Sequence, residues 1–343
     1  MPTMHDIAKR ANVAVSTVSY ALNGTRPISA ETRARIEAAM EELGYRPHAL
    51  ARGLASKRSR IIALLFPPRA GGLGTTDFEI VTGAADAARE HGYHLLLAPL
   101  PIDDREAQEQ LTMQGLIDGA VVMEIRLHDE RIDLLRAAGA TFSLIGRTAD
   151  TTGISYVDID FDQMTREAVT HLLDLGHRRI AFLNHAQLAY EAGYGPSVRA
   201  QAAYERTMRD AGLEAIVRMC EDRPAAGHET FTELLASHPD LTGLVAMNEG
   251  ATVGSVHAIT AAGKRVPEDV AVVSVASSQR AAEMTMPALT TMEVPSTEFG
   301  RLGVEALLSQ LEDEGAPLLQ RVLPCRLVVR GSSGPPPGAN ARG

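Results

Sequence analysis

The sequence lacks any long run of apolar residues, and it does not open with a basic stretch followed by a short apolar segment. A helix that crosses a membrane needs about 20 mostly apolar residues, and an export signal needs the basic and apolar segments in that order. These absences predict a cytoplasmic protein with no membrane partner. Apolar residues still make up 45% of the 343 positions and charged residues 22%, which is typical of a globular chain with two or three domains.

Cysteine is also scarce. Cys220 and Cys325 lie far apart, and neither belongs to a metal-ligand spacing. Disulfide frameworks and zinc sites need several cysteines at short, regular separations. We therefore interpret both residues as ordinary thiols and expect no metal site and no cofactor.

Recognisable catalytic signatures are missing. The chain has no G-x-S-x-G elbow and no phosphate-binding P-loop motif,. His177, Asp158 and Asp160 could supply a base or a nucleophile, but none of them stands in such a signature. His177, within GHRRI, is better interpreted as structural. We expect that the protein is not an enzyme.

Positive charge is scarce overall but concentrated at one end. The formal net charge is -10, from 33 Lys and Arg against 43 Asp and Glu. Residues 1–60 hold ten basic and five acidic side chains, which gives this segment +5 and leaves -15 for the rest. A basic segment on an acidic body indicates a phosphate-binding face on a protein that otherwise repels nucleic acid.

The basic segment opens with two short helices joined by a tight turn, over residues 3–24. Thr3 and Asp6 form a capping box at the start of the first helix,, and Asn12 suits the left-handed turn that follows. A surface hairpin is the simpler interpretation of these residues alone, but their layout is also that of a helix-turn-helix DNA reader. The outer or leading surface of the second helix carries Val15, Ser16, Thr17, Ser19, Tyr20 and Asn23.

A third helix and a basic linker complete this end of the chain. Ser29 is the expected N-cap of a helix that ends at Gly44,. Residues 45–59 then allow a helix of about two turns before a basic run. So short a helix needs a partner to be stable, and we expect it to order on DNA.

Beyond residue 60, buried strands alternate with amphipathic helices, which predicts two doubly wound α/β lobes. The expected strands are 61–66, 94–98, 119–123 and 141–146, followed by 180–184, 216–220, 241–247 and 270–275. Helices are expected around 78–91, 104–116 and 129–138. The C-terminal residues 331–343 have little to bury and are predicted to be disordered,.

Several separated motifs stand in a family-specific order. D-I-A-x-x-A-x-V-x-x-S-T-V-S-x-x-L-N-G is followed by LGYRP and ALARGL, and later by GHRRIAFL, VPEDVAVVSV, PALTTMEVP and LVVRGSS. Together they resemble the lactose-repressor (LacI/GalR) family of bacterial transcription regulators along nearly the whole chain. The resemblance implies a helix-turn-helix headpiece on a periplasmic-binding-protein-like core of two parallel-sheet lobes.

The resemblance also implies domain boundaries. The headpiece would cover 1–46, a hinge helix 47–59, an effector-binding and dimerisation core 60–330, and a tail 331–343. Within the core, the first lobe would cover about 60–160 and 292–322, and the second 161–291 and 323–330.

For the DNA contacts, the resemblance implies a homodimer on a near-palindromic double-stranded operator. Base contacts fall to Val15, Ser16 and Tyr20, and phosphate contacts to Thr17, Ser19, Asn23 and Arg26. Leu54 would wedge into the minor groove, with Ala51 allowing close approach. Two departures from the family bear on this interface. Ala14 replaces a frequent Ser, and Tyr20 replaces an Arg that is common in the family, so the operator should differ from those that Arg reads.

The cleft between the lobes is the expected site of a small-molecule effector, such as a carbohydrate. The resemblance assigns its walls to Asp77, Phe78, Arg147, Arg199, Asn248 and Glu249. Arg199 could clamp a carboxylate or donate to hydroxyls, and Phe78 could stack on a ring, although each also has an ordinary structural interpretation. In place of the usual G-F-D-D, the chain reads Ser274, Val275, Ala276, Ser277. Ala276 cannot accept hydrogen bonds from ligand hydroxyls.

The sequence therefore favours a ligand-responsive dimeric repressor. Three alternatives stay open: a regulator whose cleft no longer senses a metabolite, a solute-binding protein, and an α/β enzyme.

Overall fold

The headpiece is a three-helix unit with its own small core. The computed structural model describes residues 2–23, 26–45, 58–69, 72–113, 115–313 and 315–338. The headpiece helices are α1 (Met4–Ala11), α2 (Val15–Asn23) and α3 (Ala30–Leu43). They enclose an apolar cluster of Ile7, Ala8, Ala11, Val18, Ile36 and Ala39, separate from the clusters of the body.

Local signals set the helix ends, as the sequence predicts. The Thr3–Asp6 capping box is formed at α1, and Asn12 ends that helix with φ 52°. The Ser29 side chain accepts from the Thr32 N–H at α3, and Gly44 ends that helix with φ 62°. Positive φ is strained for most residues but accessible to Asn and Gly, so these two residues allow the chain to turn sharply after each helix.

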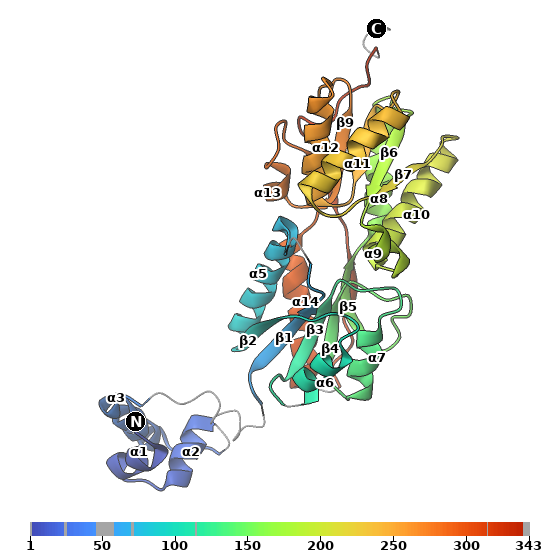
Figure 1. Ribbon diagram of the computed structural model, residues 1–343. Coiled ribbons are helices and arrows are strands. Elements are labelled where there is room, and N and C mark those ends of the chain that lie inside the picture. The colour runs from blue at the N-terminus through green and yellow to red at the C-terminus, as the bar shows by residue number, and fades with distance from the viewer. Residues whose placement is uncertain are drawn as a thin grey trace.

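The body consists of two α/β lobes arranged end to end (Figure 1). The first contains β1 (Ile61–Phe66), α5 (Thr75–Glu90), β2 (His94–Pro99), α6 (Arg105–Met113), β3 (Gly119–Met123), α7 (Glu130–Ala137), β4 (Phe142–Ile145), β5 (Ser155–Ile159), α14 (Ser296–Glu312) and β11 (Gln320–Leu323). Its sheet is parallel in the order β11-β5-β4-β3-β1-β2.

The second lobe repeats this plan. It contains α8 (Phe161–Asp174), β6 (Ile180–Asn184), α9 (Gln187–Glu191), α10 (Gly195–Asp210), β7 (Ile216–Met219), α11 (Pro224–Ser237), β8 (Gly243–Ala246), α12 (Glu249–Ala261), β9 (Ala271–Ser277), α13 (Gln279–Ala282), β10 (Thr290–Glu293) and β12 (Arg326–Val328). The strand order is β12-β10-β9-β8-β6-β7, with β12 antiparallel at the edge. The predicted pair of doubly wound lobes is confirmed, including the uncertain strand near 216.

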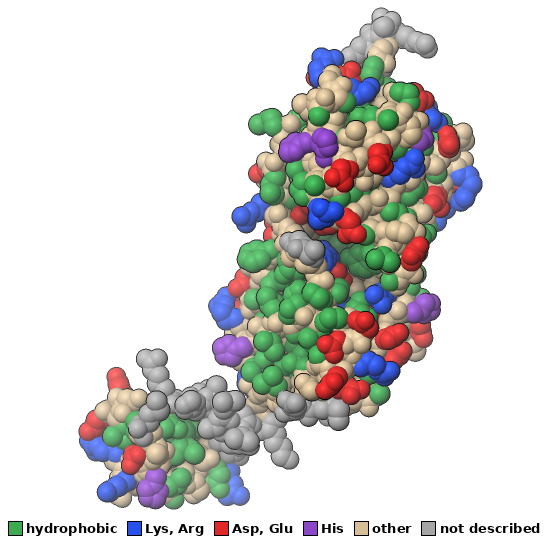
Figure 2. All heavy atoms as spheres, viewed as in Figure 1, with side chains coloured by type: hydrophobic (Ala, Val, Ile, Leu, Met, Phe, Trp, Pro, Cys, Tyr) green, Lys and Arg blue, Asp and Glu red, His purple; other side chains and the backbone are tan. Residues whose placement is uncertain are grey.

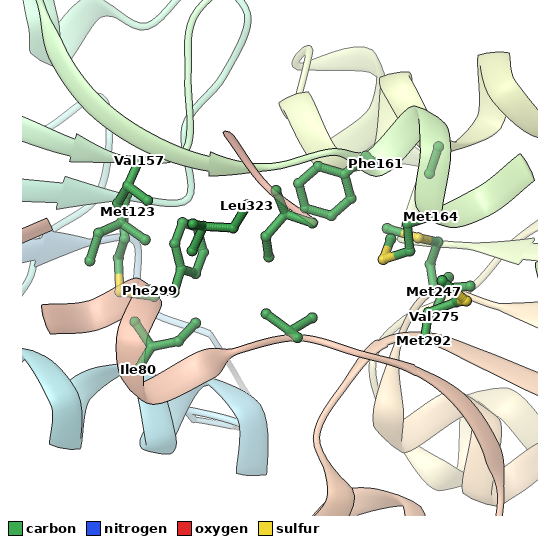
Figure 3. Close-up of a cluster of buried hydrophobic side chains, with 14 of the residues drawn as sticks. Ile80, Met123, Val157, Phe161, Met164, Met247, Val275, Met292, Phe299 and Leu323 are labelled. Atoms are coloured by element: carbon green, nitrogen blue, oxygen red, sulfur yellow. The ribbon is translucent and has the colours of Figure 1, made fainter. Parts of the chain in front are cut away.

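Three chain crossings join the lobes: β5 to α8, β10 to α14, and β11 to β12. The domain boundaries expected at 291/292 and 322/323 fall inside β10 and β11. Leu323, for example, pairs with Ile159 in the first sheet. An apolar cluster runs through the crossings, with Phe161 and Leu323 between the two sheets (Figure 3).

Glycines let one pair of helices approach closely in each lobe. A Cβ on Gly300 of α14 would lie 1.9 Å from the carbonyl oxygen of Ile80 in α5. A Cβ on Gly254 of α12 would lie 1.9 Å from the carbonyl oxygen of Pro224 in α11. Real Cβ atoms cannot come so close, so both helix pairs depend on glycine.

The predicted disorder of the C-terminal tail is wrong for residues 331–338. Ser332 is fully buried, donates to the Val272 carbonyl at 2.6 Å and accepts from the Thr290 N–H at 2.8 Å. His177 lies 2.8 Å from the Gly334 carbonyl oxygen. The segment bonds to two inner strands of the second sheet, β9 and β10, and the Val272 N–H also donates to the Ser332 carbonyl at 2.8 Å. These hydrogen bonds substitute for the apolar contacts that the segment lacks. Residues 339–343 lie outside the described part.

Candidate functional site: a reading helix and an interlobe cleft

The headpiece presents the predicted reading surface on α2. Val15 is 38% exposed, Ser16 is exposed and Thr17 is half-buried. Ala14 carries no side-chain oxygen for the first N–H groups of α2, while its carbonyl accepts from Thr17 and Val18. Those first N–H groups can therefore face a phosphate.

Tyr20 does not stand alone on this surface. The guanidinium of Arg26 lies 5.3 Å from the centre of the Tyr20 ring, a cation–π distance,. Ser19 is half-buried and has a partner of its own. The side chain of Asn23, and the hinge with Ala51 and Leu54, lie outside the described residues.

A large cavity separates the two lobes. Its volume is about 910 Å³, and it is lined from both lobes. A smaller cavity of about 110 Å³ adjoins it. Charged or aromatic residues on the walls of both cavities are Arg69, Glu124, His185, Tyr194, Asp222 and Glu249.

Arg69 is the central cation of this cleft. It follows β1, and its Nη1 donates to Asp77 Oδ2 at 3.0 Å while its Nε donates to Glu124 Oε2 at 3.1 Å. The Nη2 of Arg69 also contacts Oε1 of the same Glu124 carboxylate. The guanidinium is thus fixed between two carboxylates of the first lobe.

Asp222 of the second lobe lies within electrostatic reach of Arg69. Asp222 accepts from the Gly250 N–H at 2.8 Å, and burial raises its pKa. Burial likewise raises the pKa of Glu249, against the opposing effect of a hydrogen bond from Thr76. Burial, assisted by the charge of Arg69, lowers the pKa of His185 to about 3, so this ring is neutral at pH 7.

Glu249 also fastens the lobes together. It stands at the first turn of α12, yet its Oε2 accepts from the Thr75 N–H at 3.0 Å, and its Oε1 accepts from the Thr76 hydroxyl. A carboxylate at a helix N-terminus is favourable for the exposed N–H groups and for the helix dipole. The second lobe therefore caps α5 of the first.

A second set of contacts between the lobes centres on Asp158, which is buried on β5. Arg147 Nε lies 2.9 Å and Arg199 Nη1 3.8 Å from Asp158 Oδ2. Burial raises the pKa of Asp158 to about 6, although both guanidiniums oppose the shift. Arg199, from the second lobe, also donates to the carbonyls of Arg147 at 3.0 Å and Thr148 at 3.3 Å.

The six expected cleft residues are therefore not all brought together. Asp77 and Glu249 line the cavities. Asn248 lines the smaller one, and its Oδ1 caps α12 by accepting from Ala251. Arg147 and Arg199 line neither cavity, and their guanidiniums are engaged as described. Phe78 is 59% exposed and also lines neither cavity. It is therefore not placed to stack on the ring of a ligand in the cleft.

Sequence reasoning missed five polar residues of the walls, and a signal for most of them existed. Four of them follow the carboxyl end of a parallel strand, where ligands bind in open α/β sheets. The first polar residues after the apolar runs include Arg69, Glu124, His185 and Asp222, whereas Tyr194 lies after α9 and has no such signal.

Of the three residues considered for catalysis, Asp158 lines the smaller cavity, whereas His177 and Asp160 make structural contacts. His177 is buried, with Nδ1 3.0 Å from the Thr242 hydroxyl. Asp160 caps α8 by accepting from Gln163 at 2.9 Å. Neither lines the cavities. In the described part of the chain, no group of three or more potential metal ligands is found and no helix is long and apolar enough to cross a membrane.

A three-helix DNA-reading unit on a two-lobed body with an interlobe cavity defines a class of ligand-responsive DNA-binding protein. Family models agree with this architecture. Residues 3–48 match the bacterial regulatory proteins of the lacI family, and residues 169–333 match a periplasmic binding protein-like domain.

Individual relatives cover nearly the whole chain. The transcriptional regulator CelR of Thermobifida fusca is 30% identical over 343 residues, covering 96% of this chain and 98% of its own. A lac repressor dimer bound to operator and the anti-inducer ONPF has a TM-score of 0.83 at 25% identity, covering 97% of this chain and 99% of that one. A CelR–cellobiose complex has a TM-score of 0.72 at 28% identity, covering 97% and 100%.

This chain belongs to the lacI family of bacterial regulatory proteins. It is a sequence-specific DNA-binding regulator of transcription, and its relatives are transcriptional regulators rather than enzymes.

Proposed function

We propose that this protein is a cytoplasmic, non-catalytic repressor that binds a near-palindromic operator as a homodimer. Its affinity for the operator falls or rises when a carbohydrate or a related polyhydroxyl metabolite binds in the interlobe cleft. The observation that carries the proposal is the cavity of about 910 Å³ between the lobes. Arg69, Glu124 and Asp222 on its walls offer donors and acceptors suited to hydroxyl groups,. CelR has been solved with cellobiose in a fold like this one, which supports the choice of ligand class.

The proposed dimer uses an apolar edge of the body. Figure 2 shows hydrophobic side chains gathered over the α5 and β2 side of the first lobe. Phe78 of α5 is 59% exposed and Leu97 of β2 is 43% exposed. Met284 and Met286 after α13 are 66% and 91% exposed, and α13 packs beside α5. Exposed apolar side chains of this number favour association, so we assign Phe78 to the dimer interface rather than to the effector.

The proposed DNA contacts follow the sequence expectations. Val15, Ser16 and Tyr20 read base edges, and Thr17, Ser19, Asn23 and Arg26 contact phosphates. Leu54 and Ala51 of the hinge serve the minor groove. Because the effector binds the two lobe arrangements with different affinity, it shifts the spacing of the hinges and hence the affinity for DNA.

The proposal is tested first by thermal denaturation of the full chain with a panel of mono- and disaccharides. A ligand at one hundred times its dissociation constant stabilises the fold by about 2.7 kcal/mol. That ligand should then change the affinity for an operator selected from random oligonucleotides. If no sugar of a broad panel stabilised the protein, carbohydrates would be excluded as the effector class.

Removing the hinge wedge provides a test that needs no effector. Leu54→Ala should weaken binding to the selected operator much more than binding to unrelated duplex, because only the specific site is kinked. Equal losses on both duplexes would contradict the wedge.

One observation favours a second candidate, a regulator insensitive to metabolites. The chain's own Glu249 and Arg199 already tie the lobes together, and Ala276 offers the cleft no acceptor. In that case operator binding would be unchanged by every ligand while the Glu249→Gln variant alone altered it. The headpiece disfavours the alternative of a plain solute-binding protein. That alternative would be favoured if the full chain showed no affinity for DNA at any salt concentration.

A further inference from the structure

The chain enters the body at residues 58–60, directly after the segment that connects the body to the headpiece. Asp118, which immediately precedes β3, binds this entry point with both carboxylate oxygens. Its Oδ1 accepts from the Ser59 N–H at 2.6 Å and from the Ser59 hydroxyl at 2.9 Å, and its Oδ2 accepts from the Arg60 N–H at 3.0 Å. Hydrogen bonds to a carboxylate are charge-assisted and strong. We refer to Ser59, Arg60 and Asp118 as the entry clamp.

Arg60 takes an unusual backbone conformation within the entry clamp. Its φ is 57°, in the left-handed region that is strained for a residue with a Cβ. Its carbonyl accepts from the His94 N–H at 2.8 Å, and its guanidinium lies 4.9 Å from the centre of the Tyr93 ring. A residue keeps such a conformation only where several contacts enforce it. The contacts of Arg60 therefore fix the direction in which the chain leaves the body.

Arg58 is held as well, one residue before the entry clamp. Its Nη2 donates at 2.7 Å to the carbonyl of Leu311, in the last turn of α14. The last carbonyls of a helix have no partner within the helix, and a cation is favourable beside them. Segments at β2, β3 and α14 of the first lobe thus hold three successive residues of the entry point.

The entry clamp lies at the opposite end of the strands that lead to the interlobe cleft. β1 and β3 are parallel neighbours, in which Ile62 is paired with Gly119. Both strands begin next to the entry clamp, and Arg69 and Glu124 follow their carboxyl ends. Because Arg69 donates to Glu124, the two strands are joined at the cleft as well as at the clamp. The entry clamp therefore moves together with the first lobe.

We propose that Asp118 is a positioning residue for DNA binding: through the entry clamp it fixes where each connecting segment leaves the body, and so sets the distance between the two headpieces of the dimer. The inference rests on the proposed function. A dimer that holds its headpieces at one distance prefers operators whose half-sites have the matching spacing. Without Asp118, Ser59 and Arg60 lose three hydrogen bonds, and the connecting segments start from variable points.

The test measures how well the full chain discriminates between half-site spacings. An operator selected from random oligonucleotides is compared with a derivative that carries one added base pair between the half-sites, and with unrelated duplex. Asp118→Ala removes both acceptor oxygens, and Asp118→Asn keeps one of them. Asp133→Ala and Asp133→Asn, at an exposed position of α7 in the same lobe, are the matched controls.

The wild type and both controls should prefer the selected operator to its derivative by about tenfold or more. Asp118→Ala should bind the selected operator about tenfold more weakly, because its headpieces are no longer held in place beforehand, and its preference should fall to about twofold. Asp118→Asn should lie between the wild type and Asp118→Ala. Binding to unrelated duplex should stay unchanged, because the basic surface of each headpiece is intact.

The spacing preference separates positioning from a purely structural role. A lowered unfolding temperature of Asp118→Ala together with the wild-type preference would overturn the inference. Equal losses on the selected operator and on unrelated duplex would also overturn it. If Asp118→Ala did not fold, Asp118→Asn would decide by the same comparison.

Failure of the proposed function looks different. In that case the wild type itself would bind the two spacings with equal affinity, which would contradict a dimer on a near-palindromic operator. A wild type that discriminates between the spacings, beside an Asp118→Asn variant and an Asp118→Ala variant that do so equally well, would leave the dimer intact and overturn only the role of Asp118.

Discussion

In the headpiece, the hydrogen bonds that define each helix join residues three apart, as Thr3 with Asp6 and Ser29 with Thr32. In the interlobe cleft, the Arg69–Glu124 contact spans 55 residues and the Thr75–Glu249 contact spans 174. The reading surface is therefore a local structure whose residues can be exchanged one at a time. The cleft exists only when both lobes are folded and held together, so substitutions in the body should act on stability and those in the headpiece on DNA binding.

The largest expected effect in the body comes from Gly254→Ala. The added Cβ would press on the Pro224 carbonyl, so α11 and α12 must separate. We expect the free energy of unfolding to fall by about 3 kcal/mol. Denaturant unfolding of the body would measure this loss. His257→Ala, at an exposed position of the same helix, is the control and should change the free energy by less than about 0.5 kcal/mol. Equal values for the two variants would contradict the close approach.

Asp158→Asn should change how stability depends on pH. The folded pKa of Asp158 is raised to about 6 from 3.8, so the folded state favours the protonated form. Its contribution is complete below pH 3.8 and is lost as the pH rises through about 6, a change on the order of 2–3 kcal/mol. Urea unfolding from pH 4 to 7 should show this decline in the wild type and a flatter profile in the variant. Parallel profiles would show that Asp158 is not the titrating group.

Tyr20→Ala tests whether the headpiece reads bases through this residue. Loss of one base contact costs about 1–3 kcal/mol of specific binding, which a competition assay on selected operator and random duplex would detect. Unfolding of the body should be unchanged. Glu37→Ala, at an exposed position of α3, should leave specific binding intact. If Tyr20→Ala weakened binding to both duplexes equally, the residue would not read bases.

The smallest effect is expected at Ala276. This residue lies at φ 54°, a left-handed conformation that costs a residue with a Cβ about 1–2 kcal/mol. Ala276→Gly should therefore stabilise the body by about 0.5–1 kcal/mol after the entropy of glycine is included. Ala202→Gly, at an exposed position in the middle of α10, should instead destabilise the body by about 1 kcal/mol. A destabilised Ala276→Gly variant would show that no strain is relieved there.

The same contrast explains how much could be predicted from the sequence. Capping and turn residues such as Thr3, Asn12 and Ser29 act on their immediate neighbours, so the headpiece helices and their ends follow from short-range chemistry. The alternation of apolar runs with amphipathic helices likewise predicted two doubly wound lobes, because each element must bury one face.

The cleft could not be predicted in the same way. Which strand ends face each other depends on the three crossings and on the closure of the lobes. Arg199 accordingly turned out to donate to carbonyls of the first lobe, and Phe78 proved to be exposed. The packed segment 331–338 was missed because its partners, among them the backbone of β9 and the His177 side chain, lie far away in the sequence and composition does not reveal them. The hinge around Leu54 lies outside the described residues, so its role stays a proposal.

The decisive experiment determines the affinity of the full chain for its selected operator with and without the metabolite that stabilises the body. We expect specific, salt-dependent binding that the metabolite changes at least tenfold, by about 1.4 kcal/mol. A ligand that stabilises the body while operator affinity stays constant would show that the cleft does not control the reading helix.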